Sequence, residues 1–268
     1  MTDFTDFDTA GLLAHAEQLT LADPSGDDDV RWDAVRELHS RGEPAIFEQA
    51  TRWSNAKSPL LRALAADVLS NLDWPKDNPY AKQSEPLLTR LLNDSENAVT
   101  VSALHAMGRL QVGSITSVSA LSTHDDANIR YAVADCLSGR EDALSIATLI
   151  QLSDDPDSEV RDWATFGLGS LCDIDSTAIR TALFARLEDD DEDTRCEAMV
   201  GLATRNDTRA AGAVHKELKE DSVNGLAIAA AGLLCNPQFL PRLQELLAGN
   251  PDDPDVIHAI AECQPHEG

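Results

Sequence analysis

Aromatic residues are scarce in this chain of 268 residues. They make up 4% of it, whereas hydrophobic residues of all kinds reach 43%, with Ala and Leu abundant. β-Sandwiches and β-barrels are built from strands rich in aromatic and β-branched residues. A chain with enough apolar residues for a core but few aromatics favours helices instead. The composition therefore predicts an all-α fold.

Basic residues are also in short supply. There are 21 Lys and Arg against 47 Asp and Glu, which gives a formal net charge of −26 at pH 7. Such a surface repels phosphate backbones, so nucleic acid is not an expected partner. The charge favours a basic protein or peptide as the partner, and it would also serve solubility alone.

Cysteine clusters and long apolar runs, which mark other classes of protein, are missing. The five cysteines lie far apart, so neither a disulfide framework nor a zinc site is indicated. The longest run of apolar or glycine residues, Gly225–Cys235, is too short to cross a bilayer. The N-terminal sequence lacks the features of a signal peptide. We therefore expect a cytoplasmic protein that does not enter the membrane, and we favour a monomer.

Motifs of catalysis and metal binding are missing as well. No Gly-x-Ser-x-Gly, His-Glu-x-x-His or Gly-Lys-Ser/Thr sequence occurs. The acidic run at 189–193 resembles the start of an EF-hand loop, but Thr194 replaces the required Gly and Val200 replaces the final Glu. The sequence predicts no catalytic residue, no metal site and no cofactor.

A pattern of about 30 residues recurs along the chain instead. Its clearest copy, DDPDSEVRDWATFGLGSL at 154–171, begins with an acidic turn in which Asp157 or Ser158 can cap a helix. Small or apolar residues then follow at the spacing of one helix face: Val160, Ala164, Gly167, Leu168 and Leu171. This copy predicts a turn followed by an amphipathic helix.

Other segments align with this copy. The residue matching Arg161 lies at positions 31, 62, 100, 130, 195 and 224, so that neighbouring copies are 29 to 38 residues apart. This period is typical of stacked helical hairpins, of which we expect about eight. The remaining helices are predicted at Thr9–Leu19, Pro44–Trp53, Glu85–Asn93, Ser114–Ser122, Asp142–Ser153, Ser176–Glu188, Asp207–Leu218, Gln238–Ala248 and Pro254–Cys263.

The capped turn, the Val-Arg pair and the small residues after it resemble HEAT repeats, in particular the short HEAT-like repeats of phycobilisome (PBS) lyases. The resemblance implies an α-α superhelix, a HEAT-like α-solenoid, forming a single domain over residues 1–268. Residues 1–28 would form an N-terminal cap helix and an acidic loop. Residues 29–235 would form the repeats and 236–268 a C-terminal capping pair.

Two segments interrupt the pattern. Pro24–Asp29 is rich in Asp, and Asp73–Ser84 holds two prolines among polar residues, so both are predicted as loops. Loops on a rigid scaffold often carry recognition. The second loop is therefore either a recognition element or a tolerated insertion.

An arginine recurs in the first turn of the second helices, where it opposes the helix dipole. The positions are Arg31, Arg62, Arg130, Arg161 and Arg195. We interpret them as a structural ladder in which each arginine pairs with an aspartate of its own or an adjacent turn. The candidate acids are Asp29, Asp125, Asp126, Asp155, Asp157, Asp189 and Asp191. An anion-binding stripe is the functional alternative.

In repeats of this family the second helices line the concave surface, which implies a partner-binding groove there. Positions two and six residues after the first apolar residue would face it. They include Trp32, Arg36, Asp67, His105, Tyr131, Asp135, Asp162 and Phe166. Exposed aromatics among acids would suit a basic partner. The same aromatics could instead fill the core.

The leading functional hypothesis is a non-enzymatic interaction scaffold that binds a partner protein, expected to be basic, in an acidic concave groove. A bilin-lyase-type subunit is the enzymatic alternative that the resemblance implies. An acidic inhibitor or immunity-like protein is a third hypothesis.

Overall fold

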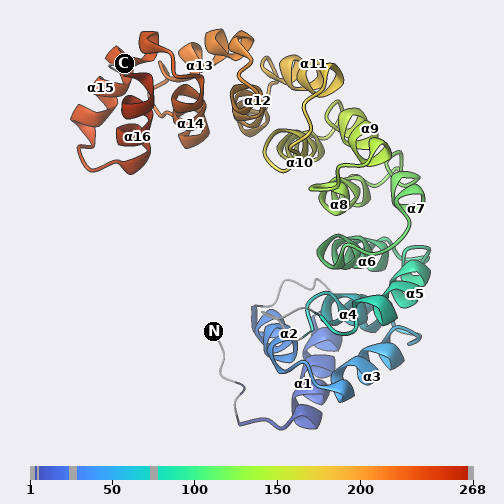
Figure 1. Ribbon diagram of the computed structural model, residues 1–268. Coiled ribbons are helices and arrows are strands. Elements are labelled where there is room, and N and C mark those ends of the chain that lie inside the picture. The colour runs from blue at the N-terminus through green and yellow to red at the C-terminus, as the bar shows by residue number, and fades with distance from the viewer. Residues whose placement is uncertain (1–3, 5, 24–28, 73–77, 265–268) are drawn as a thin grey trace. The chain divides into compact units, whose positions relative to one another are not determined.

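The computed structural model describes residue 4 and residues 6–23, 29–72 and 78–264 (Figure 1). These residues form sixteen α-helices and two 3₁₀-helices, and no strand occurs among them. In this part of the chain no helix is both long enough and apolar enough to span a membrane. The predicted all-α, solenoid-like fold is confirmed.

The chain divides into two compact units, Met1–Cys136 and Leu137–Gly268. In the first unit the helices follow one another as pairs: α1 (Thr9–Ala22) and α2 (Asp29–Arg41), α3 (Pro44–Trp53) and α4 (Pro59–Leu69), α5 (Ala81–Leu91) and α6 (Asn97–Leu110), α7 (Ile115–Ser119) and α8 (Ala127–Leu137). The prediction of a single domain over 1–268 stays a prediction.

The second unit continues the series of pairs. It contains α9 (Ala143–Leu152) and α10 (Ser158–Gly169), α11 (Thr177–Arg186) and α12 (Glu192–Thr204), α13 (Ala211–Glu217) and α14 (Gly225–Leu234), α15 (Leu240–Gly249) and α16 (Pro254–Cys263). Short 3₁₀-helices, Thr208–Ala210 and Pro237–Phe239, precede α13 and α15.

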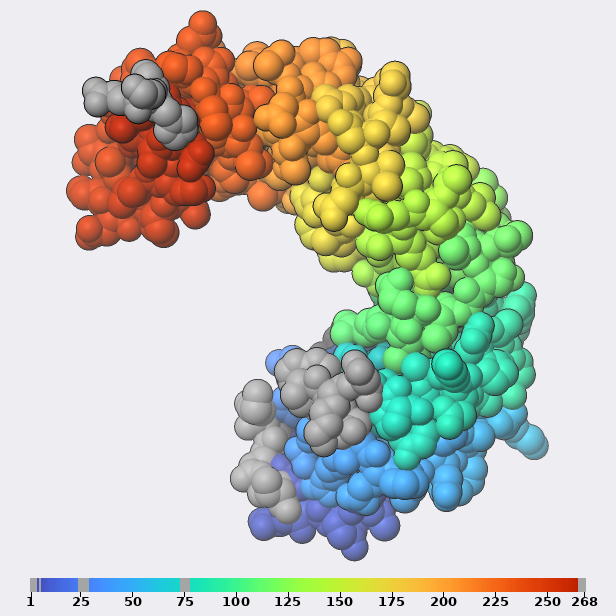
Figure 2. Space-filling view, viewed as in Figure 1, coloured from blue at the N-terminus to red at the C-terminus, as the bar shows by residue number. Residues whose placement is uncertain are grey.

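The second helices of neighbouring pairs pack on one another within each unit. Helix α4 packs on α6, and α10, α12, α14 and α16 pack in succession. Figure 2 shows the result as consecutive bands of colour, because each pair is followed in space by the next pair of its unit. Glycine permits the closest approach: a Cβ on Gly201 of α12 would lie 2.6 Å from the Cα of Gly169 on α10.

Helix starts follow the acidic turns. Asp157, and not Ser158, caps α10, because its Oδ1 accepts from the backbone N–H groups of Glu159 at 3.0 Å and Val160 at 3.3 Å. Asp142 caps α9 and Asp191 caps α12 in the same way. The acidic turns therefore set where these three helices begin.

The predicted apolar face of α10 is correct except at its end. Val160, Ala164, Gly167 and Leu168 are all buried. Leu171 is 44% exposed, because the helix ends at Gly169 and the side chain no longer follows the helical phase.

Several predicted limits need correction. The segment Asp207–Leu218 is not one helix, since a 3₁₀ turn precedes α13. The predicted helix Ser114–Ser122 shortens to α7. The predicted loop Asp73–Ser84 ends earlier, because α5 begins at Ala81 and the Ser84 N–H already bonds to the Tyr80 carbonyl at 2.8 Å. Parts of the two predicted loops, 24–28 and 73–77, lie outside the described residues.

Candidate functional site

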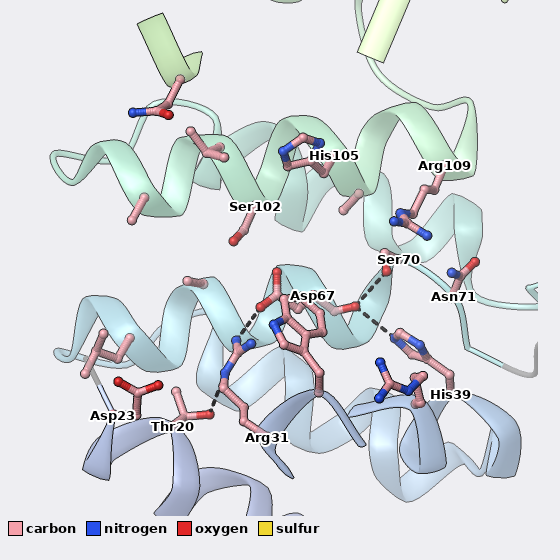
Figure 3. A pocket seen from close by; sticks show the side chains of 18 of the residues that line it. Thr20, Asp23, Arg31, His39, Asp67, Ser70, Asn71, Ser102, His105 and Arg109 are labelled. Atoms are coloured by element: carbon pink, nitrogen blue, oxygen red, sulfur yellow. Dashed lines mark hydrogen bonds and ion pairs between the residues drawn. The ribbon is translucent and has the colours of Figure 1, made fainter. Parts of the chain in front are cut away.

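A groove of about 1140 Å³ runs along the second helices of the first unit (Figure 3). Its walls come from the end of α1, from α2, α4 and α6, and from the start of α8. Two cavities in the second unit are smaller, at about 390 and 430 Å³. The groove is large enough for a segment of a partner chain.

Four of the predicted partner-binding residues line this groove: Trp32, Arg36, Asp67 and His105. Trp32 is 37% exposed, and the side chain of Arg36 is 57% exposed although it pairs with Asp33. Helix phase brings these residues together, because positions two and six after the first apolar residue share one face of each second helix.

Asp67 forms an ion pair within the protein, so its carboxylate is not open to a partner. Its carboxylate, only 10% exposed, pairs with the guanidinium of Arg31. Arg31 Nε also donates to Thr20 Oγ1 at 3.2 Å. The contacts of Arg31 thus join α1, α2 and α4. The acid that pairs with Arg31 in the described residues lies within helix α4 and was not among the candidate acids.

The Trp32 indole packs against Arg31, a member of the same ion pair. The Arg31 guanidinium carbon lies 4.7 Å from the centroid of the indole ring, which is a cation–π contact. Because Asp67 and Thr20 hold Arg31 in place, Arg31 in turn limits the movement of the Trp32 indole at the groove.

His105 contacts two further predicted residues. Its Nδ1 lies 2.6 Å from Asp135 Oδ2, and its ring meets that of Tyr131 edge to face at 6.3 Å between centroids. Neither Tyr131 nor Asp135 lines the groove itself. Asp162 and Phe166 belong to the second unit.

The charges of the groove lining balance. Three arginines face three aspartates, namely Arg31, Arg36 and Arg109 against Asp23, Asp67 and Asp126. Two histidines, His39 and His105, complete the titratable groups. The acidity of the chain is therefore not concentrated in the groove of the first unit.

Acidic side chains gather instead on α10 and α12 of the second unit. Burial raises the pKa of Asp162 from its ordinary value of 3.8 to about 6, and the charges of Asp193 and Asp191 add to the rise. Among the residues that the structure describes, none donates a hydrogen bond to its buried Oδ1. Burial likewise raises the pKa of Glu197 to about 6, although the Ser170 hydroxyl donates to its Oε2 at 3.1 Å. Asp162 and Glu197 are therefore largely charged only above about pH 6.

The recurring arginines share one contact pattern. Nη1 donates to the carbonyls six and five residues earlier, in the turn before the helix, in Arg62, Arg130, Arg161 and Arg195. Three of them also reach an acid of a following turn or helix: Arg62 reaches Asp94, Arg161 reaches Asp189 and Asp190, and Arg195 lies 3.8 Å from Glu217. The hydrogen bond from Arg62 is the main reason why the pKa of Asp94 lies below its ordinary value. Whether these contacts stabilise the fold stays a prediction.

A family model described as HEAT repeats matches residues 84–169 and 146–225, which together span more than half of the chain. The chain belongs to the HEAT-repeat family. This agrees with the repeat of capped turn, arginine and small residues. The matched model describes HEAT repeats in general and does not single out the PBS-lyase type.

Relatives of this HEAT-repeat chain include Protein YibA of Escherichia coli (strain K12), which is 29% identical over 240 residues, covering 86% of this chain and 84% of YibA. Protein YibA of E. coli O157:H7 matches equally well. The X-ray structure of E. coli YibA superimposes with a TM-score of 0.70 at 24% identity over 98% of each chain. An engineered protein reaches a TM-score of 0.57 at 18% identity, over 94% of this chain and 77% of its own. These structural likenesses show the fold.

One arginine that joins two HEAT pairs was not predicted from the sequence. Arg205, which follows α12, is 8% exposed. Its two Nη atoms donate to the carbonyls of Leu168, Gly169, Cys172, Ile174 and Gly201 at 2.6–3.1 Å. The guanidinium therefore satisfies carbonyls at the C-terminal end of α10, where the helix dipole favours a cation. Backbone acceptors leave no mark in the sequence that could have revealed this contact.

His39 and Arg109 are two further groove residues that were missed. Both project from second helices of HEAT pairs toward one end of the groove (Figure 3). His39 follows Trp32 by seven residues and Arg109 follows His105 by four, so the helical spacing of the predicted residues was the available signal.

Proposed function

We propose that this chain is a non-enzymatic interaction scaffold that binds a partner protein along its second helices. The observation that carries the proposal is the groove of the first unit, in which Trp32 and Arg36 stand exposed above a set of internally paired residues. Trp and Arg are the residue types that most often dominate binding energy at protein interfaces.

The braced position of Trp32 supports the proposal. Arg31 lies against the indole and is held by Asp67 of α4 and Thr20 of α1. A side chain that is fixed before binding loses little conformational freedom when a partner arrives. The groove is therefore built to present an aromatic anchor.

The acidic surface of α10 and α12 supports a basic partner. Partial burial raises the pKa values of Asp162 and Glu197, and no described residue donates a hydrogen bond to Asp162 Oδ1. A Lys or Arg side chain would supply that donor and favour the charged form of both carboxylates. Phe166, with its ring 5.4 Å from that of Trp163, adds an aromatic element to the same helix. We place the acidic part of the partner-binding surface here.

The bilin-lyase and inhibitor hypotheses gain no observation of their own from the described residues.

Affinity capture tests the proposal. Immobilised full-length chain would be exposed to lysate at about 0.15 M salt, and retained proteins would be identified and then titrated in purified form. We expect a partner that binds the parent chain, is lost with Trp32→Ala, and is retained with Phe184→Ala. Phe184 is the matched control, because it is an exposed aromatic (44%) on α11, a first helix. A chain that retains nothing, or equal losses in both variants, would refute the scaffold.

A further inference from the structure

Among the described residues, one end of the first-unit groove gathers nitrogen-bearing side chains, and the lining carboxylate of Asp67 is already paired with Arg31. Arg109 reaches this end from the last turn of α6, and His39 reaches it from α2 (Figure 3). Ser70 and Asn71, which follow α4, complete its lining. The Ser70 hydroxyl already donates to the Asp67 carbonyl at 2.7 Å, which leaves Arg109 and His39 to face the groove.

Arg109 differs from the other groove arginines. Arg31 pairs with Asp67 and Arg36 pairs with Asp33, whereas no Asp or Glu of the described residues forms an ion pair with Arg109. With the Asn71 amide turned so that both of its ends are satisfied, Asn71 Oδ1 accepts from Arg109 Nη1 at 3.3 Å. Most of the guanidinium donors of this exposed side chain thus remain open, in a chain with 47 acidic residues.

His39 is oriented by one hydrogen bond. Its Nε2 lies 2.9 Å from the Asp67 carbonyl, which can only accept, so Nε2 carries the proton. Burial lowers the pKa of His39, and the nearby charge of Arg109 lowers it further, against the opposite effect of Asp67. The neutral imidazole leaves Nδ1 unprotonated. An anion beside Arg109 would offset the charge that opposes protonation there.

We propose that this end of the groove binds a carboxylate, an Asp or Glu side chain on a segment of the partner protein, which Arg109 holds as a guanidinium fork and His39 holds through Nδ1 once protonated. At neutral pH one open guanidinium beside a neutral imidazole offers a single positive charge, which matches a single carboxylate, and protonation of His39 at lower pH adds a second donor. At neutral pH a doubly charged phosphate would leave one of its negative charges unmatched at the site.

The inference rests on the proposed function, because it names a group that the scaffold's partner presents. It concerns one point of the first-unit groove. The acidic surface of α10 and α12 would receive the basic groups of the partner independently.

Peptide probes on the purified full chain test the inference directly. The probe is fluorescein-labelled, C-terminally amidated tetraglutamate, measured by anisotropy at about 0.15 M salt, beside tetraglutamine and tetralysine of the same design. We expect tetraglutamate to bind despite the overall charge and tetraglutamine not to bind. Arg109→Gln should weaken tetraglutamate binding about ten-fold, and Arg109→Lys should weaken it less, because Lys keeps the charge without the fork.

Arg52→Gln is the matched control, because Arg52 is exposed on α3, outside the groove, and donates to the neutral Gln49 Oε1. It should bind tetraglutamate as the parent chain does. Binding should strengthen from about pH 7.5 to about pH 5.5, and His39→Gln should reduce that gain. Absent tetraglutamate binding, equal binding by Arg109→Gln, or full competition by equimolar inorganic phosphate would overturn the inference.

The outcomes separate the two proposals. A partner that is lost with Trp32→Ala but binds Arg109→Gln normally leaves the scaffold standing and removes the carboxylate site. Tetraglutamate binding that depends on Arg109, without any retained partner, supports the site and removes the scaffold.

Discussion

Arg161 donates to Asp189, twenty-eight residues farther along the chain, through Nε at 2.9 Å and Nη2 at 2.7 Å. The two side chains are only 10% and 4% exposed. Arg161 Nη1 meanwhile bonds to the Asp155 carbonyl at 3.0 Å, in the turn before its own helix. One guanidinium therefore links the turn before α10 to the turn before α12. The contribution of this link to the free energy of unfolding can be measured.

Replacing Arg161 tests whether the arginine ladder stabilises the fold. Arg161→Ala leaves Asp189 buried with Arg186 Nη1, at 3.2 Å, as its remaining basic partner. We expect the free energy of unfolding to fall by about 3 kcal/mol, measured by urea denaturation, with partner binding unchanged. Arg209→Ala is the control, because the Arg209 side chain is 48% exposed and Asp207 keeps Arg180 as an ion-pair partner, so the loss should be smaller than that of Arg161→Ala. Unchanged stability of Arg161→Ala would dispose of the ladder.

Arg205 is a buried cation whose guanidinium donates to backbone carbonyls. Arg205→Met should lower the free energy of unfolding by about 3 kcal/mol, since carbonyls such as those of Leu168 and Cys172 would lose their donor. Arg205→Lys keeps the charge with fewer donors and should lie between the two in thermal denaturation. A Met variant as stable as the parent chain would show that water replaces the guanidinium at no cost.

The contact between α10 and α12 depends on two glycines. Gly201→Ala would place a Cβ 2.6 Å from the Cα of Gly169, a backbone atom that cannot move aside without shifting the helix. We expect a loss of about 2 kcal/mol in the free energy of unfolding. Gly212→Ala is the matched control in helix α13, where a Cβ meets nothing within 4 Å. It should stabilise the chain by about 0.5–1 kcal/mol, through helix propensity. Equal effects of the two variants would contradict close packing at Gly201.

The helices were predictable because their signals are local. The limits of Pro44–Trp53 and Pro254–Cys263 were predicted correctly, since proline in the first turn marks each start. The start of α5 was missed because the polar residues up to Ser84 were assigned to the loop, whereas α5 already begins at Ala81. The 3₁₀ turn before α13 carries an aspartate cap like that of an α-helix, so the sequence did not distinguish the two.

Helix phase predicted some of the residues that line the groove, but not the contacts between helices. Trp32, Arg36 and His105 line it because they share the groove-facing positions of their helices. The partner of Arg62 is Asp94, which was not among the candidate acids, because the pairing depends on how one turn sits beside the next. The ion pair of Asp67 was missed for the same reason. Contacts between residues about thirty apart are set by packing, which a single sequence does not display.

The raised pKa of Asp162 makes stability depend on pH. The folded-state pKa of about 6 lies above the ordinary 3.8, so between these values the folded chain keeps a proton that the unfolded chain has released. The contribution of this group therefore falls as pH rises from about 4 to about 6 and stays at its lowest above that. Asp162→Asn removes the penalty. We expect the variant to equal the parent chain near pH 4 and to exceed it by about 1 kcal/mol at pH 7, after allowance for partial exposure.

Urea denaturation of both chains at several pH values measures this difference. Asp221→Asn, which changes an exposed carboxylate before α14, should leave the pH profile of the parent chain in place. Glu197 provides a second measurement, because the charge of Asp162 contributes to the raised pKa of Glu197. The Glu197 titration should therefore move to lower pH in Asp162→Asn, which NMR of the carboxyl carbons can follow. A constant difference in stability from pH 4 to pH 7 would contradict the burial of the Asp162 charge, since the cost of that charge exists only where the group is ionised.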